Sequence, residues 1–410
     1  MADTRTMSRR RQVFDAVYLF LGCVLLLVGV YGLFVRIRFV PYTSNDFMQD
    51  YEAARNLKSG RSIYHGQAET ANYHPPTVAV LILPIANLPY PAAARWWSFF
   101  CLICLAATVW IVFRALEVSL PLRWSLIFLG GLLCWYPVQG HIAIGQFSIL
   151  IALLLVLAWQ NLRKGRQTLG GLFVGVACLL KLFPALLVVY FLFRRKWLAL
   201  STMVLAIGLG YSLALAVVGF EDTWHYFTVV IPQDVEVFAA FPVNLSLNGV
   251  FSRLFTSSPW IAPLADLPWL AAWLTNLLVV SITAGLAWLV YRLPPNLPGD
   301  DLAFALHLPA MLLLSPLTWW HANILLFLAL VWLLKNQGFQ KNRAGLMLLL
   351  VAFLLLSLPD IDLANFVMNS TAPYRPPWYV GLLMWGNTLG ISIVYGMQVS
   401  QAAALIREAE

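Results

Sequence analysis

A series of long apolar runs, separated by short polar segments, dominates this sequence. The first extends from Val13 to Val35, and similar runs recur along the rest of the chain. Each is close to the roughly 20 residues with which an α-helix crosses a ~30 Å hydrocarbon core. Charged residues make up only 11% of the chain, against about 25% in soluble proteins. The sequence therefore predicts an all-α, polytopic integral membrane protein, and the lack of alternating polarity excludes a transmembrane barrel.

The apolar runs predict about twelve crossings within a single domain, residues 1–410. The predicted spans are 13–35, 77–90, 92–113, 122–137, 146–160, 168–193, 197–219, 268–292, 301–316, 320–335, 344–358 and 378–400. Arg9 to Arg11, before the first span, predict a cytoplasmic N-terminus. The two long loops, 36–76 and 220–267, then both face the extracytoplasmic side of the plasma (inner) membrane and are expected to carry short amphipathic helices.

The net charge of +8 does not indicate nucleic-acid binding, because Lys and Arg lie in short clusters between the apolar runs. Membrane lipids are the expected anionic neighbours. One cluster, Arg163 to Arg166, falls outside in this topology, against the positive-inside rule, and a single misassigned span among 77–160 would reverse it. The five cysteines lie in or beside apolar runs, so neither a disulfide framework nor a zinc site is expected.

The first long loop contains the strongest candidate for a catalytic group. Thr43 and Asp46 resemble a capping box and Ser59-Gly60 supplies a stop, so a short helix is predicted over 46–58. Asp50 lies one turn after Asp46, and this repulsive pair is not explained by helix stability. A carboxylate at the membrane–water boundary can act as a general base. The alternative is that Asp46 only offsets the helix macrodipole.

Two further polar residues interrupt apolar surroundings. Lys181 precedes Pro184 inside a predicted span, where an unpartnered charge costs roughly 2.5–3.5 kcal/mol, so it either binds an anion or snorkels to the interface. His321 follows Trp319-Trp320 at a predicted helix end, where it is either a site residue or part of an ordinary aromatic belt. The sequence contains no P-loop, GxGxxG, HExxH or GxSxG motif, so an activated substrate would have to come from the membrane.

An ordered set of short motifs resembles a known family. The motifs are Asp46-Phe47, Tyr51, Ala53-Ala54, Gly60, Tyr64, Tyr73-His74-Pro75-Pro76, Gly145-Gln146, Lys181-Leu182-Phe183-Pro184, Asn244-Leu245-Ser246 and Ser315-Pro316 to His321. In order and spacing this set, which covers about 40–325, is similar to glycosyltransferase family 87. These enzymes are polyprenol-phosphate-mannose-dependent α-mannosyltransferases of the GT-C superfamily. Family members commonly have Tyr-Pro-Pro where this chain inserts His74, and Asp50 is not part of the family pattern.

The resemblance implies a GT-C-like helical bundle with an extracytoplasmic active site. It also implies an inverting transfer of a hexose, with mannose expected, from a polyprenyl-phosphate donor to a hydroxyl of a lipid or glycan acceptor. Asp46 matches the family's catalytic Asp. One carboxylate suffices for inversion, so no cofactor or metal is expected. The alternatives are a GT-C enzyme that uses another lipid-linked sugar, and a secondary transporter or lipid flippase, which the missing internal repeat disfavours.

The remaining site residues are predicted from their chemistry and their place in these motifs. Asp50 and His321 are expected to support Asp46. Positive charge for the donor phosphate is expected from Arg55, Lys58, Lys181 and Arg253. Residues expected at the acceptor or elsewhere in the pocket are Tyr51, Tyr73, His74, Gln146, Asn244 and Trp320.

Overall fold

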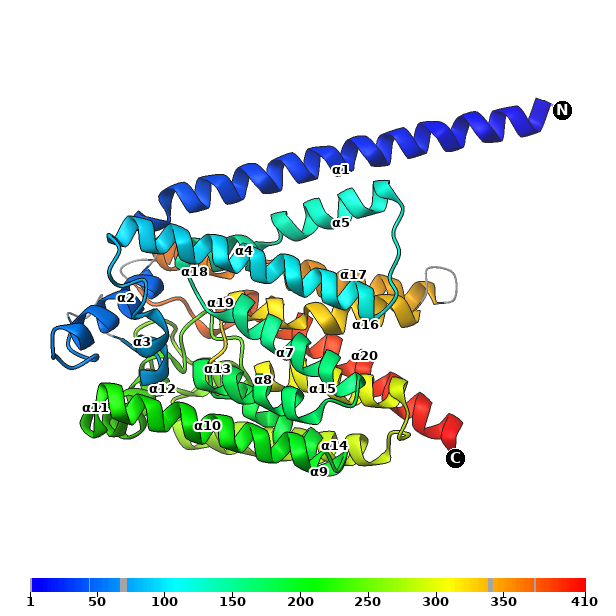
Figure 1. Cartoon of the computed structure of the whole chain (residues 1–410). Helices are drawn as coiled ribbons and strands as arrows, with labels where there is room; N and C mark the ends of the chain where they lie inside the picture. The colour runs from blue at the N-terminus through cyan, green and yellow to red at the C-terminus, as the bar shows by residue number, and fades with distance from the viewer. Residues whose placement is uncertain (1, 44, 67–71, 338–341, 372–373) are drawn as a thin grey trace.

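The computed structural model describes residues 2–43, 45–66, 72–337, 342–371 and 374–410. Within them, helices form one elongated bundle, with α1 (Ala2–Thr43) along one edge (Figure 1). Both termini emerge at one end of this bundle, and α2 (Asn45–Lys58), α11 (Phe220–His225) and α12 (Ile231–Phe238) lie at the other end. The predicted all-α membrane fold is confirmed.

The described residues contain fewer full-length spanning helices than the twelve predicted crossings. The described helices long and apolar enough to span are α1, α4 (Tyr90–Ala115), α10 (Trp197–Val218), α14 (Pro268–Arg292), α15 (Leu297–Leu314) and the segment Trp378–Ala409, which contains α19 (Trp378–Gly381), η4 (Leu382–Trp385) and α20 (Gly386–Ala409). Two bent pairs can each add one span: α5 (Leu122–Cys134) with α6 (Tyr136–Ile144), and α17 (Arg343–Leu355) with α18 (Asp360–Thr371). The shorter apolar elements are α7 (Ser148–Arg163), α8 (Gln167–Leu180), η1 (Phe183–Leu186) with α9 (Leu187–Phe193), and η3 (Trp320–Leu326) with α16 (Phe327–Gln337).

The predicted span 77–90 is wrong. Its place is taken by α3 (Pro76–Ile82), a helix of 7 residues, followed by turns up to the start of α4. Pro84 and Pro89 explain the difference, because proline lacks the amide hydrogen that a continuing helix needs. The run is apolar, but it is shorter than the roughly 20 residues of a crossing, and its prolines prevent a continuous helix.

The predicted span 168–193 is wrong in another way, because it forms a helical hairpin. The chain breaks at Lys181, whose backbone is extended (φ −150°, ψ 144°), between α8 and η1. Arg163, before the hairpin, ion-pairs with Asp301, and Arg194, after it, ion-pairs with the adjacent Asp300. Both legs therefore start and finish at the same end of the bundle, with Lys181 at the hairpin tip.

One predicted span is lost and another becomes two legs, so the two long loops remain on the same side of the membrane. Loop 36–76 and loop 220–267 still meet at one end, where Asp222 accepts hydrogen bonds from the Ser62 hydroxyl and the Ile63 amide (2.7 and 2.8 Å). The second loop carries α11, the π-helical turn η2 (Tyr226–Val230), α12 and α13 (Leu247–Phe255). The basic cluster 163–166 moves to the opposite end, together with the cluster 194–196.

Candidate active site

A cavity of about 650 Å³ lies where the two long loops meet the bundle. Its walls come from α2, the segment 73–75, the hairpin tip, α12, α14, the end of α15 and the residues that follow it. The predicted site residues that line it are Asp46, Tyr73, His74, Gln146, Lys181, Trp320 and His321. Residues from distant parts of the sequence therefore meet at one place.

Asp46 is held by an amide. It lies in the first turn of α2, half-buried, and the Gln146 side-chain amide donates a hydrogen bond to its carboxylate. Gln146 follows Gly145, whose left-handed backbone (φ 74°) ends α6 in a conformation that favours glycine. The indole of Trp97 donates to the carbonyl of Gly145 (2.9 Å). This turn therefore fixes the amide that orients Asp46, as expected for a site built on rigid elements.

Asp50 does not line the cavity but bonds to a residue that does. Its carboxyl is buried, and one oxygen lies 2.8 Å from Nδ1 of His74. The other oxygen has no hydrogen-bond partner among the described residues. Burial raises the pKa of Asp50, and the neighbouring His74 opposes this shift. The two residues by which the chain departs from the family pattern are thus bonded to each other.

Lys181 reaches the cavity from the hairpin tip, and Asp234 reaches it from α12. Sequence reasoning did not select Asp234; its only signal was a carboxylate within a short, otherwise mostly apolar helix of the second loop. The pKa of Asp234 is raised to about 6, mainly by burial. Asp46 contributes to this rise, and His74 and Lys181 oppose it. The cavity therefore holds two carboxylates and one lysine that act on one another electrostatically.

Two histidines lie together at the cavity: His321 lines it, and His141 packs next to His321. His321 is 1% exposed, and its Nδ1 lies 2.8 Å from the hydroxyl of Ser148. The ring of His141 is 6.5 Å from that of His321, and neither of its nitrogens is hydrogen-bonded within the described residues. His141 was also missed by sequence reasoning, because a histidine in an apolar segment gives no signal of its own.

The other predicted site residues lie outside the cavity lining. Arg55 pairs with Glu52 at 3.8 Å, and Lys58 donates to the side-chain oxygen of Asn87. Arg253 is buried and donates to the carbonyls of Phe241 and Asn244 (3.0 and 2.7 Å). Of the four cations predicted for the donor phosphate, only Lys181 therefore reaches the cavity.

Tyr51 and Asn244 support the walls. The hydroxyl of Tyr51 donates to the carbonyl of Leu88 (2.7 Å), which ties α2 to the turns before α4. The Asn244 amide donates to the carbonyl of Pro316 (3.1 Å), and its oxygen accepts from the amide of Thr318 (3.1 Å). Asn244 thereby joins the second loop to the segment that leads to His321.

A cluster of ionisable side chains within a membrane bundle marks a functional site. A carboxylate, a lysine and aromatic rings around one cavity are the groups that a membrane-embedded transferase needs for a sugar and a phosphate. The family model for glycosyltransferase family 87 matches residues 72–316, and the chain belongs to this family. It is therefore an integral-membrane glycosyltransferase, and the transporter alternative is not favoured.

Curated relatives agree with this assignment. The chain is 27% identical over 312 residues to a polyprenol-phosphate-mannose-dependent α-(1-2)-phosphatidylinositol pentamannoside mannosyltransferase of Mycobacterium tuberculosis, covering 75% of this chain and 68% of that protein. It is 25% identical over 255 residues to an α-(1->3)-arabinofuranosyltransferase of the same species, covering 61% and 55%. ArnT from Cupriavidus metallidurans, solved with undecaprenyl phosphate, aligns with 13% identity over 94% of this chain and 77% of its own, at a TM-score of only 0.34.

Proposed function

We propose that this enzyme transfers mannose from a polyprenyl-phosphate donor to a hydroxyl of a lipid-linked acceptor, with inversion, on the extracytoplasmic face of the plasma (inner) membrane. The observation that carries the proposal is the placement of Asp46, oriented by Gln146, in the same cavity as Lys181. The names of the mannosyltransferase relatives favour mannose and a phosphatidylinositol-linked acceptor. The arabinofuranosyltransferase relatives leave another lipid-linked sugar as the alternative.

In the proposed reaction Asp46 acts as the general base. The acceptor hydroxyl gives its proton to the carboxylate while its oxygen attacks the anomeric carbon, and the bond from that carbon to the phosphate oxygen breaks. The Gln146 amide holds one carboxylate oxygen, which leaves the other for the acceptor. No covalent enzyme intermediate is needed, and we propose that no metal takes part.

The leaving group is a polyprenyl phosphate, so the site must stabilise negative charge. Lys181 and Nε2 of His321, whose Nδ1 is engaged by Ser148, are the proposed ligands of this phosphate. The polyprenyl tail is proposed to leave through the apolar part of the cavity, between the hairpin (Phe183, Leu186) and Val279 of α14. Asp234 is proposed to accept hydrogen bonds from sugar hydroxyls.

Charge distribution supports the proposed sidedness. The clusters 163–166 and 194–196 both lie at the end of the bundle opposite the cavity. By the positive-inside rule that end faces the cytoplasm. The cavity is then extracytoplasmic.

The test is transfer of radiolabelled mannose from polyprenyl-phosphate-mannose by the purified protein, compared with the same assay on polyprenyl-phosphate-arabinose. Wild type should transfer mannose to a phosphatidylinositol mannoside. Asp46→Asn should lose at least 100-fold, in keeping with the 10²–10⁴ that general bases contribute. Asp266→Asn, a carboxylate outside the cavity that accepts from the Ser257 amide, is the matched control and should be unaffected. No transfer of either sugar, or an Asp46→Asn variant with more than a tenth of wild-type turnover, would refute the proposal.

A further inference from the structure

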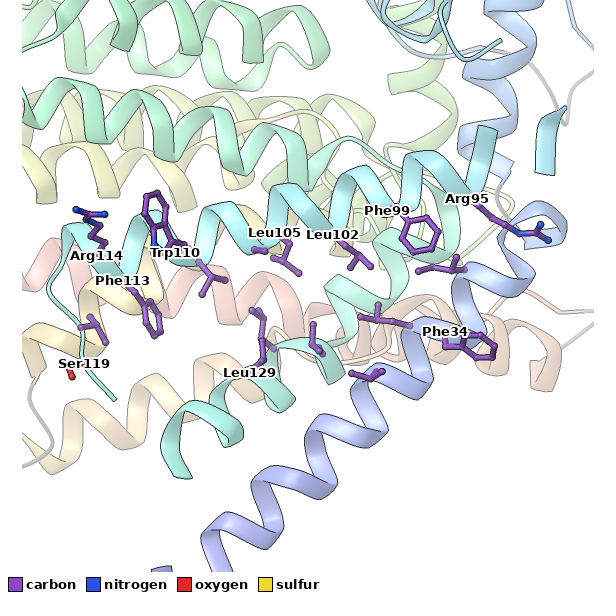
Figure 2. A pocket seen from close by; sticks show the side chains of 18 of the residues that line it. Phe34, Arg95, Phe99, Leu102, Leu105, Trp110, Phe113, Arg114, Ser119 and Leu129 are labelled. Atoms are coloured by element: carbon purple, nitrogen blue, oxygen red, sulfur yellow. The ribbon is translucent and has the colours of Figure 1, made fainter. Parts of the chain in front are cut away.

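A second, larger hollow lies on the flank of the bundle, outside the site described above. It is a groove of about 1370 Å³ between α1 and α4, with α5 as its floor. Figure 2 shows Phe34 and Arg95 at one end of the groove, Arg114 at the other, and apolar side chains such as Leu102 between them. Because its volume exceeds the about 300–1,000 Å³ of ordinary small-molecule sites, it is suited to long chains.

The groove opens to the membrane. α1 and α4 are both spanning helices, and the rings of Phe34 and Phe99 that line the groove are 64% and 50% exposed. In a bilayer these surfaces meet hydrocarbon chains. The α1 wall runs from Val30 to Arg38, about 12 Å of helix at 1.5 Å per residue, which is close to half of a ~30 Å hydrocarbon core. The part of the groove closed by α1 therefore matches one leaflet.

The end of the groove near the catalytic cavity is positively charged. Arg38 and Arg95 both line it. Arg95 is half-buried and makes no ion pair or hydrogen bond with any described residue, and the guanidinium carbon of Arg38 lies 5.9 Å from the ring centre of Phe39. Two arginines at headgroup level are a suitable site for a phosphodiester.

Three buried aromatic rings, here called the aromatic wall, link this end of the groove to residues next to the proposed base. Trp97, two residues after Arg95, stacks on Phe47 at 5.9 Å between ring centres and packs against Phe147 at 4.9 Å. Phe47 follows Asp46, and Phe147 follows Gln146. The arginine end of the groove is therefore connected to Asp46 and Gln146 through packed aromatic rings.

We infer that this groove holds the diacyl anchor of the acceptor, an anionic phospholipid whose phosphate lies between Arg38 and Arg95 and whose sugar headgroup extends over the aromatic wall to Asp46. The inference rests on the proposed function for the identity of this lipid as acceptor. The proposed donor tail leaves on the other side of the cavity, along α14. Two lipid substrates then enter from separate flanks and meet at Asp46, without competing for one path.

The first experiment maps lipid contacts without using activity. Purified full-length protein is incubated with a diacyl phosphatidylinositol that carries a photoreactive acyl chain, irradiated, and digested for peptide mapping. Cross-links should concentrate in residues 30–38 and 95–102, and Arg38→Gln/Arg95→Gln should reduce them at least fivefold. Arg36→Gln, on the same helix but outside the groove lining, is the matched control and should leave them unchanged. Cross-links spread evenly over the spans, or equal labelling by a photoreactive phosphatidylcholine, would overturn the inference.

The second experiment uses transfer kinetics with two acceptors, a diacyl phosphatidylinositol mannoside and its deacylated form. The double variant should raise the KM for the diacyl acceptor at least tenfold, with kcat and the donor KM within twofold of wild type. The KM for the deacylated acceptor should change little. Equal changes for both acceptors, or no change for either, would contradict the groove as anchor site. If wild type uses neither acceptor, the proposed function fails, and the cross-linking map still decides the groove.

Discussion

Replacement of Lys181 by methionine tests the assignment of the donor-phosphate site. Lys181 is the only one of the four predicted phosphate cations that lines the cavity, and its flexible, singly charged side chain is replaced by an apolar one of similar length. A hydrogen bond between a charged donor and a phosphate oxygen contributes about 1.5–3 kcal/mol. At 1.4 kcal/mol for each factor of ten, kcat/KM should fall roughly tenfold to 150-fold.

The assay is steady-state transfer of radiolabelled mannose by the purified variant, with donor KM and kcat measured separately. If Lys181 binds the phosphate equally before and during the reaction, its loss raises KM alone. If it stabilises charge that develops on the leaving group, its loss lowers kcat as well. Lys58→Met is the matched control, because Lys58 bonds to Asn87 outside the cavity. Lys181→Met values within twofold of wild type, or an equal loss in Lys58→Met, would refute the reasoning.

Three further predictions follow from the same geometry. Asp50→Asn should reduce kcat/KM about threefold to tenfold and flatten the acidic limb of its pH profile, because burial raises the pKa of Asp50 and it acts through His74; an unchanged limb would show that this pair is uncoupled from catalysis. Since burial raises the pKa of Asp234 to about 6, its carboxylate forms as pH rises from 5 to 7 and accepts stronger hydrogen bonds from the sugar hydroxyls. Donor KM should therefore fall roughly tenfold over this interval, about 1.4 kcal/mol, and stay flat in Asp234→Asn; parallel profiles would contradict this. In a cysteine-free background, an impermeant thiol reagent should label Ser59→Cys in intact cells and Lys164→Cys only after permeabilisation, and labelling of both from one side would break the topology.

The features of the fold that depend on local composition could be predicted from the sequence. Apolar runs predicted the membrane class, and capping and stop residues predicted a helix over 46–58 that the structure places at Asn45–Lys58. Pro84 and Lys181 also indicated breaks in the predicted spans, but the spans were assigned from the length of the apolar runs. The direction of the chain after Lys181 could not be predicted, because it depends on ion pairs between Arg163 or Arg194 and α15, far apart in sequence.

The same limit applies to the candidate site. Asp46, Gln146 and His321 were found because they occur in recognisable motifs. Asp234 and His141 occur in none, and only tertiary packing brings them to the cavity or behind it. Conversely, Arg253 has the right charge in the right loop, yet it is used to hold backbone carbonyls. Charge and loop position therefore do not distinguish a ligand-binding cation from a structural one.

Because Lys181 lies at the tip of the hairpin, its position depends on how the hairpin legs pack near the opposite end of the bundle. The α8 leg packs so closely on α10 that a Cβ atom at Gly171 would lie 2.0 Å from the carbonyl oxygen of Ala199, and one at Gly175 would lie 2.8 Å from that of Met203. Gly171 is about 15 Å along the chain from Lys181, at 1.5 Å per helical residue. A methyl group added there would displace the leg, and with it the cation at its tip. Alleles that weaken donor binding should consequently map to a helix–helix contact toward the opposite face of the bilayer, far from the proposed substrate site.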